Sequence, residues 1–156
     1  MIVDVAIQDR ASLDKILEEG FEGWYLRHSK GILRDVEAVR AAVASGTPIG
    51  LVMLKRLEAD VGYVYYIAVT RDHRRMGIGR LLLEDSVQRF KTAGVREVFA
   101  GVETDNRPSE ALFESEGFAR TNFGEVSKKY GRLRTFNMYR MMVVVPGEVL
   151  LRKEIA

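Results

Sequence analysis

The clearest pattern in the chain is a switch from strand-like to helix-like spacing near its middle. Residues 61–69 form a β-branched and aromatic run of the kind that makes a buried strand. A short turn rich in arginine and glycine follows. Leu83, Val87 and Phe90 then recur at helical spacing, and Gly94 marks the end of the predicted helix. The pattern therefore predicts a strand, a glycine turn and a helix in direct succession.

The residues before this stretch predict a strand, two helices and a further strand. Alternating apolar positions over residues 2–7 indicate the first strand. Ser12 is predicted to cap a helix that runs to Glu19. A second helix is predicted over residues 35–44, although periodicity leaves open whether its end is a short strand. Residues 49–54 are predicted to form the strand that precedes the central one.

The residues after the central helix predict further strands and one short helix. Residues 95–102 indicate a short buried strand, and residues 105–116 a helix with proline in its first turn. Strand structure is predicted from Phe118 onward, with a loop over residues 127–132. A last strand over residues 135–145 is predicted to lead into a short tail. Runs of adjacent strands around one strand–helix–strand unit predict a mixed α+β fold.

Length and composition favour one globular domain. With 156 residues the chain is expected to form a single domain, residues 1–156. A hydrophobic content of 47% and a charged content of 29% are typical of a soluble protein. The net charge of +2 argues against a nucleic-acid partner. No apolar run reaches membrane-spanning length and no basic region precedes the apolar N-terminus, so we expect no membrane partner, no signal peptide and a cytoplasmic location.

Residue usage excludes several kinds of site. The chain has no cysteine, which excludes disulfides, thiolate catalysis and cysteine metal sites. It has two histidines, His28 and His73, which are too few for a dedicated histidine metal site. We therefore expect no metal. His28 has no partner that the sequence reveals and is expected at the surface.

The glycine turn has the composition of an anion-binding site. A helix that starts directly after a turn presents bare backbone N–H groups and a positive dipole end to an anion. Gly77 and Gly79 have no Cβ, so a ligand oxygen can approach the backbone closely. A Walker phosphate loop and a dinucleotide fingerprint are excluded, because neither Gly-Lys-Ser/Thr nor a third glycine follows. A pyrophosphate would match the positive charges that crowd the turn, which are Arg71, Arg74, Arg75 and Arg80.

The order Arg74-x-x-Gly77-x-Gly79, after a strand that ends Ile67-Ala68-Val69, resembles the acetyl-CoA motif of the GNAT superfamily of N-acetyltransferases. The resemblance implies the GNAT fold, which is α+β with a central mixed, mostly antiparallel sheet flanked by helices. It also implies that turn amides bind the CoA pyrophosphate and that the preceding strand pairs with the pantetheine arm. The cofactor-binding residues that it implies are Ile67, Val69, Arg74, Arg75, Met76, Gly77, Ile78, Gly79 and Arg80.

A second stretch resembles the later motif of the same family. Residues 102–106, Val-Glu-Thr-Asp-Asn, precede residues 111–118, Ala-Leu-Phe-Glu-Ser-Glu-Gly-Phe. Asn106 lies six residues before Leu112, the family's usual spacing, and by resemblance it orients the cofactor beyond its thioester. Phe113 joins the predicted cofactor-binding residues. It stands where the family usually has a tyrosine that can protonate the departing CoA thiolate.

Phe113 leaves the proton donor open, because a phenyl ring has no proton to give. Tyr130, Tyr139 and water are the alternative donors. The larger problem is the acceptor, since an alkylamine has a pKa of about 10.4 and only about one molecule in 2,500 is uncharged at pH 7. Glu103 is the first candidate for the base, directly or through a water, although it is equally well explained as a solvated carboxylate at a strand end.

The resemblance implies an enzyme that moves the acetyl group of acetyl-CoA to a primary amine. The acceptor is a small molecule or a protein or peptide N-terminus, and it attacks the thioester directly in a ternary complex. No covalent intermediate is expected, because no cysteine and no recognisable nucleophile–base pair are present. Trp24 and Tyr25 are candidates for the acceptor pocket or for packing under the sheet. Family habit suggests a homodimer, and the alternative class is a non-catalytic module that binds or senses acyl-CoA.

Overall fold

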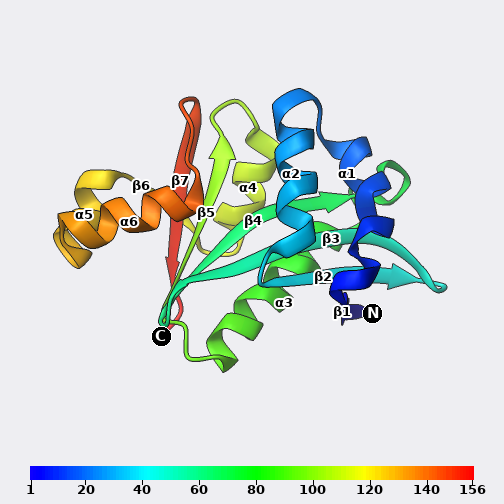
Figure 1. The fold of residues 1–156 in the computed structure, drawn as a ribbon, viewed down its shortest axis with the longest axis horizontal. Helices are drawn as coiled ribbons and strands as arrows, with labels where there is room; N and C mark the ends of the chain where they lie inside the picture. Colours follow the sequence, from blue (N-terminus) through cyan, green and yellow to red (C-terminus); the bar gives the residue numbers. More distant parts are fainter. The chain divides into compact units, whose positions relative to one another are not determined.

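Seven strands hydrogen-bond in the order β1-β2-β3-β4-β5-β7-β6 in the computed structural model, which describes residues 1–156 (Figure 1). The strands are β1 (Ile2–Asp4), β2 (Ala38–Ala44), β3 (Thr47–Glu58), β4 (Val61–Val69), β5 (Glu97–Glu103), β6 (Ala119–Thr121) and β7 (Glu148–Glu154). The sheet is mostly antiparallel with one parallel pair, which confirms the predicted α+β class.

Two short 3-10 helices and six α-helices accompany the strands. The 3-10 helices are η1 (Ile7–Leu13) and η2 (Arg71–His73). The α-helices are α1 (Asp14–Gly20), α2 (Gly23–Asp35), α3 (Ile78–Thr92), α4 (Arg107–Ser115), α5 (Phe123–Tyr130) and α6 (Arg132–Met142). The chain divides into two compact units, the first made of Met1–Lys55 and Val64–Gln88, the second of Arg56–Tyr63 and Arg89–Ala156.

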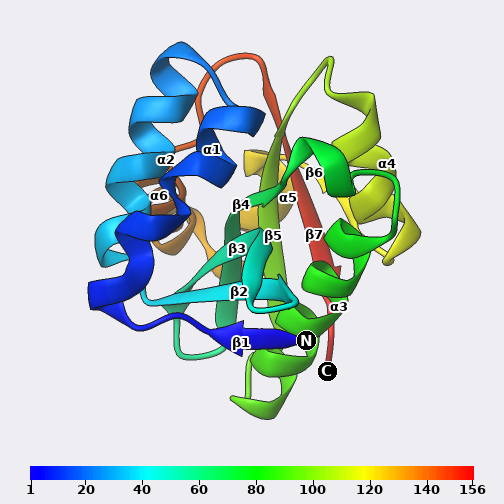
Figure 2. The ribbon, with the colours of Figure 1, turned by 90° about the vertical axis from the view of Figure 1, so that its right-hand side faces the viewer.

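In the first unit, helices cover both faces of an antiparallel sheet. β1 pairs with β2, and β2 pairs with β3. Figure 2 shows α1 and α2 on one face of these strands and α3 on the other. Gly50 on β3 permits the close approach of α3, because a Cβ there would lie 3.2 Å from the side chains of Ile78 and Leu82. The largest fully buried side chains of this unit are Leu13, Leu17, Leu33, Leu51, Met53, Leu54, Leu82 and Leu83.

Two arginines stabilise the helices of the first unit through hydrogen bonds and ion pairs. Arg10 is only 4% exposed and donates to the carbonyls of Leu33 (3.2 Å) and Val36 (2.7 Å), where α2 ends. These bonds satisfy carbonyls at a helix end that has no further intrahelical donors. Arg40 on β2 forms ion pairs with an aspartate of β1 and with one of α3. Both arginines thus compensate polar groups at the edges of the apolar core.

In the second unit, β7 lies between β5 and β6 and pairs antiparallel with both. Glu97 at the start of β5 is opposite Glu154 at the end of β7. Figures 1 and 2 show α4 and α6 on opposite faces of β5 and β7. Thr135, Met138 and Met142 of α6 are buried, at the spacing of one helical face.

The central elements and α4 confirm the sequence prediction. β4 has the predicted bounds, and α3 begins directly after the glycine turn. α4 begins after Asn106, which caps it, and has Pro108 in its first turn. These elements share strong local signals, namely a long apolar run, a clear helical stripe and a cap.

The prediction for the N-terminal third is partly wrong. The first strand ends at Asp4, and residues 7–13 form η1. Ser12 does not cap α1, because its hydroxyl donates to the Asp9 carbonyl instead. The helix predicted over residues 35–44 is also wrong, since most of that segment is β2.

The helix that the sequence prediction missed is α2, which precedes the segment predicted as helical. Its sequence, Gly-Trp-Tyr-Leu-Arg-His-Ser-Lys-Gly-Ile-Leu-Arg-Asp, starts with an aromatic, glycine-punctuated stretch that hides the helical stripe. The stripe itself is narrow, with Ser29 and Leu33 the buried residues. The β2 segment was predicted to be helical because its alanine and valine residues fit both the helical and the strand periodicity.

The prediction for the C-terminal segment is wrong as well. α5 and α6 occupy the predicted loop over residues 127–132 and most of the strand predicted over residues 135–145. Asn122 caps α5 by accepting a hydrogen bond from the Glu125 amide at 2.9 Å. The predicted tail is β7, which is paired on both sides. Consecutive apolar residues after Tyr139 imitate a strand, whereas the buried positions follow a helix.

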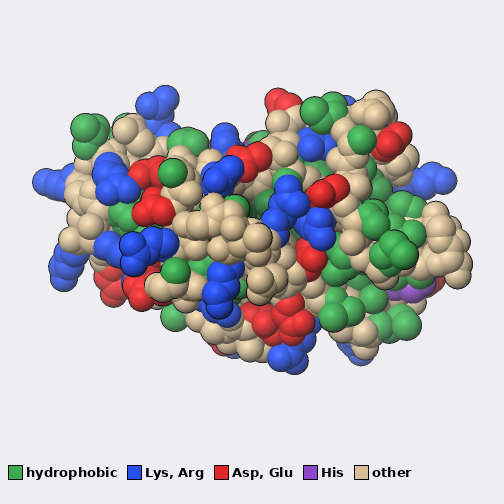
Figure 3. All heavy atoms as spheres, turned by 90° about the horizontal axis from the view of Figure 1, so that it is seen from below, with side chains coloured by type: hydrophobic (Ala, Val, Ile, Leu, Met, Phe, Trp, Pro, Cys, Tyr) green, Lys and Arg blue, Asp and Glu red, His purple; other side chains and the backbone are tan.

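Charges of both signs lie on the surface. On the face drawn in Figure 3, lysine and arginine side chains are interspersed with aspartate and glutamate side chains. The net charge of +2 therefore does not gather into one basic patch on that face. None of the helices combines the length and the apolar character that crossing a membrane requires.

Candidate active site

The turn between β4 and α3 has the backbone of an anion-binding loop. At the end of β4, the Thr70 amide donates to the Ile49 carbonyl at 2.9 Å, which ties the start of the turn to β3. Arg75 and Gly77 then take positive φ angles of 62° and 81°. A side chain is strained at such an angle, whereas glycine is not. These two positions lead the chain into α3, which begins at Ile78.

The first turn of α3 carries amides that the helix itself does not use. The Leu81 amide donates to the Gly77 carbonyl at 3.0 Å, which is the first bond of this helix. Helix geometry gives the amides of Ile78 and Gly79 no intrahelical acceptor, so they can point at a ligand anion. α3 is 15 residues long, and its dipole adds partial positive charge at this end. A Cβ at Gly77 would meet no atom within 4 Å, so the space beside the turn is open.

The arginines of the turn differ in the contacts that their side chains make. Arg74 donates through Nε to the Val69 carbonyl (3.1 Å) and through Nη2 to the Glu19 carbonyl (2.9 Å). Its side chain therefore braces the turn against the end of α1. Arg80 pairs with Glu84 one turn later, at 3.3 Å, and all four arginines of the turn are exposed. The turn thus fits a pyrophosphate both in backbone shape and in charge.

The predicted pantetheine strand is accessible at the predicted positions. Ile67 and Val69 are half-buried, whereas Ala68 between them is buried. This alternation is that of a strand with one face in the core. The pairing of Ile67 and Val69 with the pantetheine arm stays a prediction, as does a contact of Met76, whose side chain is 63% exposed.

In the second unit, the second motif forms the end of β5 and the start of α4. Glu103 is the last residue of β5 and is half-buried. The Asn106 side chain accepts a hydrogen bond from the Ser109 amide (3.3 Å), and the Asn106 amide donates to the Glu103 carbonyl (3.0 Å). Phe113 is 6% exposed and packs edge-to-face on Phe118, with ring centroids 5.1 Å apart. An apolar side chain therefore suits this position as a core residue.

The two candidate proton donors lie on helices rather than in the predicted loop and strand. The Tyr130 hydroxyl at the end of α5 donates to the carboxylate of Glu97, which is only 1% exposed. Burial and this carboxylate raise the pKa of Tyr130, so the phenol stays protonated at neutral pH. Burial also raises the pKa of Tyr139 on α6, whose ring packs on Phe123.

Glu103 and Tyr130 lie at opposite ends of β5. Glu97, which binds Tyr130, is the first residue of the strand and Glu103 is the last. A strand rises about 3.3 Å per residue, so about 20 Å separates the two carboxylates. A reaction that uses Glu103 as base therefore needs Tyr139 or water, rather than Tyr130, as its proton donor.

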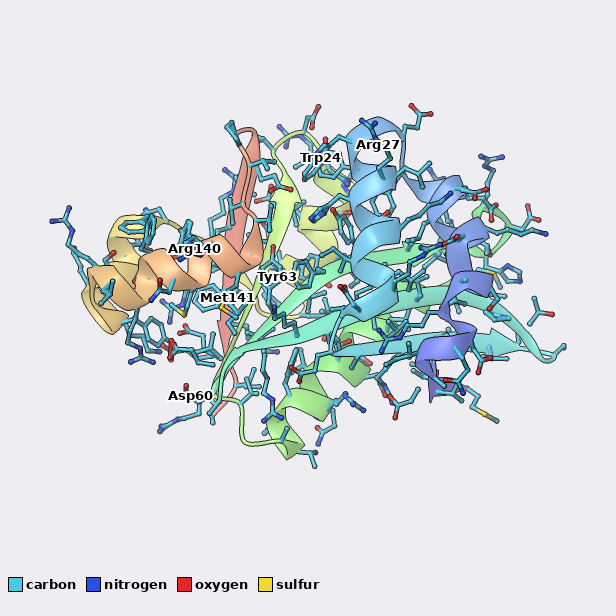
Figure 4. All side chains as sticks on the ribbon, in the orientation of Figure 1. Trp24, Arg27, Asp60, Tyr63, Arg140 and Met141 are labelled. Carbon is cyan, nitrogen blue, oxygen red and sulfur yellow. The ribbon has the colours of Figure 1, made fainter.

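Two polar clusters escaped the sequence prediction. The first joins Tyr63 on β4, labelled in Figure 4, to the middle of β5. Tyr63 is 4% exposed, and its hydroxyl lies 2.9 Å from the place where a Cβ at Gly101 would stand. Oε1 of Glu148 is 3.9 Å from the same place. A glycine inside a buried strand is the sequence signal for such a close approach.

The second cluster corrects the expectation for His28, which is half-buried. Its Nδ1 is 2.7 Å from the hydroxyl of Tyr66 on β4. Its ring stacks on Trp24, one turn earlier on α2, with centroids 4.7 Å apart. The spacing of the aromatic residues on α2 is the only sequence signal for this cluster. The structure shows no group of three or more histidine, aspartate and glutamate side chains that could hold a metal ion.

The comparisons with known proteins bear on both motifs. The model of the acetyltransferase (GNAT) family matches residues 9–118, which is more than half of the chain and includes both motifs. The chain belongs to the GNAT family. The predicted family is thus confirmed.

Named relatives of this GNAT chain are acetyltransferases. N-alpha-acetyltransferase 60 from Drosophila melanogaster is 38% identical over 68 residues, which are 42% of this chain and 25% of that protein. The ribosomal protein bS18-alanine N-acetyltransferase from Salmonella typhimurium is 39% identical over 59 residues, 38% of this chain and 40% of that protein. The alignments thus span less than half of either relative. Their names do not favour a non-catalytic module.

Solved structures match the fold of this GNAT chain over its whole length. The crystal structure of the PaiA N-acetyltransferase from Thermoplasma acidophilum in complex with coenzyme A has a TM-score of 0.74 at 17% identity. The match covers 99% of this chain and 98% of that one. At this identity the match shows the fold alone, and it agrees with the predicted GNAT architecture.

Proposed function

We propose that this chain is an acetyl-CoA-dependent N-acetyltransferase. The observation that carries the proposal is the turn between β4 and α3, where positive φ angles at Arg75 and Gly77 lead into the open first turn of a long helix. The amides of residues 75–80 would hold the pyrophosphate. The backbone of Ile67 and Val69 would pair with the pantetheine arm. Membership of the GNAT family supports the same reading.

The proposed reaction exchanges the thiol of CoA for an amine at the acetyl carbon. The acceptor nitrogen attacks the carbonyl carbon, a C–N bond forms, the C–S bond breaks, and the thiolate leaves. A thiol has a pKa of about 8.5, so the thiolate is a tolerable leaving group near neutral pH. A backbone amide of the strand would polarise the carbonyl, as an oxyanion-type donor does.

Proton transfer is assigned to side chains of the second unit. Glu103 at the end of β5 is the candidate base, directly or through a water. Asn106, which is held to Glu103 through the backbone, would orient the cofactor beyond its thioester. Tyr139 or water would protonate the thiolate, because Phe113 has no proton to give and Tyr130 is already bound to Glu97.

The acceptor is a primary amine. The names of two relatives, an N-alpha-acetyltransferase and a ribosomal protein alanine N-acetyltransferase, support a polypeptide N-terminus, and a small amine is the alternative. A single domain over residues 1–156, a cytoplasmic location and a homodimer stay predictions.

Calorimetric titration with acetyl-CoA tests the cofactor, with dephospho-CoA and NAD as controls. Saturable binding of acetyl-CoA and no binding of NAD are expected. Release of CoA thiol is then followed with short peptides that carry a free N-terminal alanine, serine or methionine, and with small primary amines. Failure to bind acetyl-CoA would refute the proposal. Binding without transfer to any acceptor would refute the transferase assignment alone.

A further inference from the structure

One side of α6, in the second unit, exposes large apolar side chains to solvent. Leu133 is 76% exposed, Phe136 is 55% exposed, and Val143, the residue after the helix, is 40% exposed. Leu133 and Phe136 stand at i and i+3, so they share one side of the helix. The residues that α6 buries lie on the opposite side. Large apolar side chains gathered on one exposed side of a helix are typical of a binding surface.

The same side of α6 is positively charged. Arg132 and Arg140 are exposed, and Arg140, labelled in Figure 4, stands at i+7 from Leu133. The helix contains no aspartate or glutamate. The third arginine of the helix, Arg134, already donates through Nε to the carboxylate of Glu58 at 3.1 Å. The exposed side of α6 therefore offers two arginines and no carboxylate.

These five residues, Arg132, Leu133, Phe136, Arg140 and Val143, make up the α6 face. Its apolar side chains suit apolar side chains of a partner, and its arginines suit carboxylates. Complementary charge of this kind selects a partner and fixes its orientation. The chemistry of the α6 face therefore matches a partner that is both apolar and acidic.

The C-terminal end of the α6 face leads to the end of β5. Residues 143–147 join α6 to β7. The Gly147 carbonyl accepts hydrogen bonds from the amide (2.8 Å) and the hydroxyl (2.7 Å) of Thr104. Thr104 follows Glu103, the candidate base, and Glu148 at the start of β7 is opposite Glu103 in the sheet. The segment that continues the α6 face is thus bonded to the strand end where the acceptor amine is expected.

We infer that the α6 face binds an acidic, apolar segment of the acceptor polypeptide, downstream of the N-terminal amine that is acetylated. The inference rests on the proposed acetyltransferase function and names its substrate class. Apolar side chains of the segment pack on Leu133, Phe136 and Val143, and its carboxylates pair with Arg132 and Arg140. No bond forms or breaks on this face, so it contributes to binding of the acceptor and not to the chemical step.

Other occupants suit the α6 face less well. In a two-fold dimer the same surface meets itself, so the arginines of two copies would gather with no carboxylate from either α6. A single-stranded nucleic acid binds by stacking its bases on aromatic rings, and Leu133 and Val143 provide none. An acidic polypeptide with apolar side chains uses every residue of the face.

The length of α6 sets the length of the segment. The helix has 11 residues and is therefore about 16 Å long. An extended polypeptide rises about 3.3 Å per residue, so about five residues cover the face. A peptide probe therefore needs a free N-terminus, a flexible linker and a short charged segment.

The test compares two peptides that differ only in the sign of their charge. Each has a free N-terminal alanine, a flexible Gly/Ser linker and a segment in which leucine alternates with a charged residue. This residue is glutamate in the acidic peptide and lysine in the basic peptide. The wild type should have a KM about tenfold lower for the acidic peptide, with similar kcat, because the face binds substrate and transition state equally.

Substitutions of apolar residues test the packing. Leu133→Ser and Phe136→Ser should each raise the KM for the acidic peptide about tenfold and leave kcat unchanged, as truncation of an interface anchor does. Ile7→Ser is the matched control, because Ile7 is 69% exposed but lies on η1 in the first unit. It should leave the KM unchanged. An equal rise of KM in Ile7→Ser would overturn the assignment to α6.

Reversal of charge tests the ion pairs. Arg132→Glu/Arg140→Glu should prefer the basic peptide to the acidic one. Lys15→Glu/Lys91→Glu changes the net charge by the same amount at two exposed sites outside α6 and should keep the wild-type preference. Calorimetry with acetyl-CoA and the rate of transfer to a short alanine peptide without the charged segment should be unchanged in all variants. This result would show that the variants are folded.

The outcomes separate this inference from the function on which it rests. Equal KM values for the two peptides in the wild type, with transfer to the short peptide intact, would refute the inference and leave the transferase standing. An unchanged preference in Arg132→Glu/Arg140→Glu would do the same. Tighter binding of oligouridylate than of the acidic peptide, lost in this double variant, would overturn the inference in favour of a nucleic acid. If the wild type acetylates no peptide and no small amine, the proposed function and the inference fail together.

Discussion

Replacing Gly77 by alanine separates the conformation of the turn from its proposed contact with pyrophosphate. Gly77 has φ +81° and no atom within 4 Å of an added Cβ. Gly46, in the turn between β2 and β3, has φ +79° and is equally open. Neither alanine would clash, so both variants bear only the cost of a left-handed conformation, about 1–2 kcal/mol. Gly46→Ala is therefore a matched control within the same unit.

The two variants should differ in acetyl-CoA affinity alone. An alanine at position 77 that relaxes its φ re-aims the amides of Ile78 and Gly79. A hydrogen bond to a charged group contributes about 1.5–3 kcal/mol, so the loss of one such bond weakens binding roughly ten- to a hundredfold. Gly46→Ala should bind acetyl-CoA as the wild type does.

Urea denaturation measures the loss of stability that both variants share, and calorimetry with acetyl-CoA measures their affinities. Equal destabilisation with selective loss of binding in Gly77→Ala is the expected result. Wild-type affinity in a destabilised Gly77→Ala protein would show that the turn does not carry the pyrophosphate. An equal loss of affinity in both variants would show that the effect is global.

Three further predictions concern the second unit. Asn106→Ala and Asn122→Ala each remove a helix cap and should lose about 1 kcal/mol of stability in urea, but only Asn106→Ala should weaken acetyl-CoA binding. Tyr130→Phe removes the donor to buried Glu97 and should lose about 1–3 kcal/mol. Folding raises the pKa of Tyr130. Protonated Tyr130 therefore contributes fully to the free energy of unfolding below about pH 10, and this contribution is lost as the pH rises. Unfolding curves at alkaline pH should show this loss in the wild type but not in Tyr130→Phe. The pKa of Glu110 is lowered, first by its hydrogen bond to an arginine of β6. Ionised Glu110 therefore contributes to the free energy of unfolding above about pH 4.3, and this contribution is lost in acid. Acid unfolding of Glu110→Gln should lack that loss.

The local sequence determined the helices and strands whose sequence signals do not depend on distant partners. β4 is a continuous apolar run, α3 has a full helical stripe, and α4 has a capping asparagine, and each formed where predicted. The glycine turn was also readable, because positive φ at Gly77 is a property that only the backbone near that residue controls. The family and the cofactor class followed from these elements.

The tertiary structure decided what depends on distant partners. β2 and β7 are strands because their neighbours pair with them, although alanine-rich β2 also fits a helix. Packing of Met138 and Met142 into the core makes α6 a helix, although the run of apolar residues that follows imitates a strand. Propensity is a weak prior that such contacts override.

The same division holds for the candidate site. Sequence motifs located the turn, Asn106 and the substitution Phe113, because these depend on spacing along the chain. Only the folded chain brings the imidazole of His28 to Tyr66, which lies 38 residues away, and ties Tyr130 to Glu97. A hydrogen bond between residues far apart in the sequence needs only one suitable side chain at each position. It therefore produces no repeating pattern along the chain. The sequence by itself therefore determined where acetyl-CoA is expected to bind, whereas tertiary packing decided which polar side chains lie together.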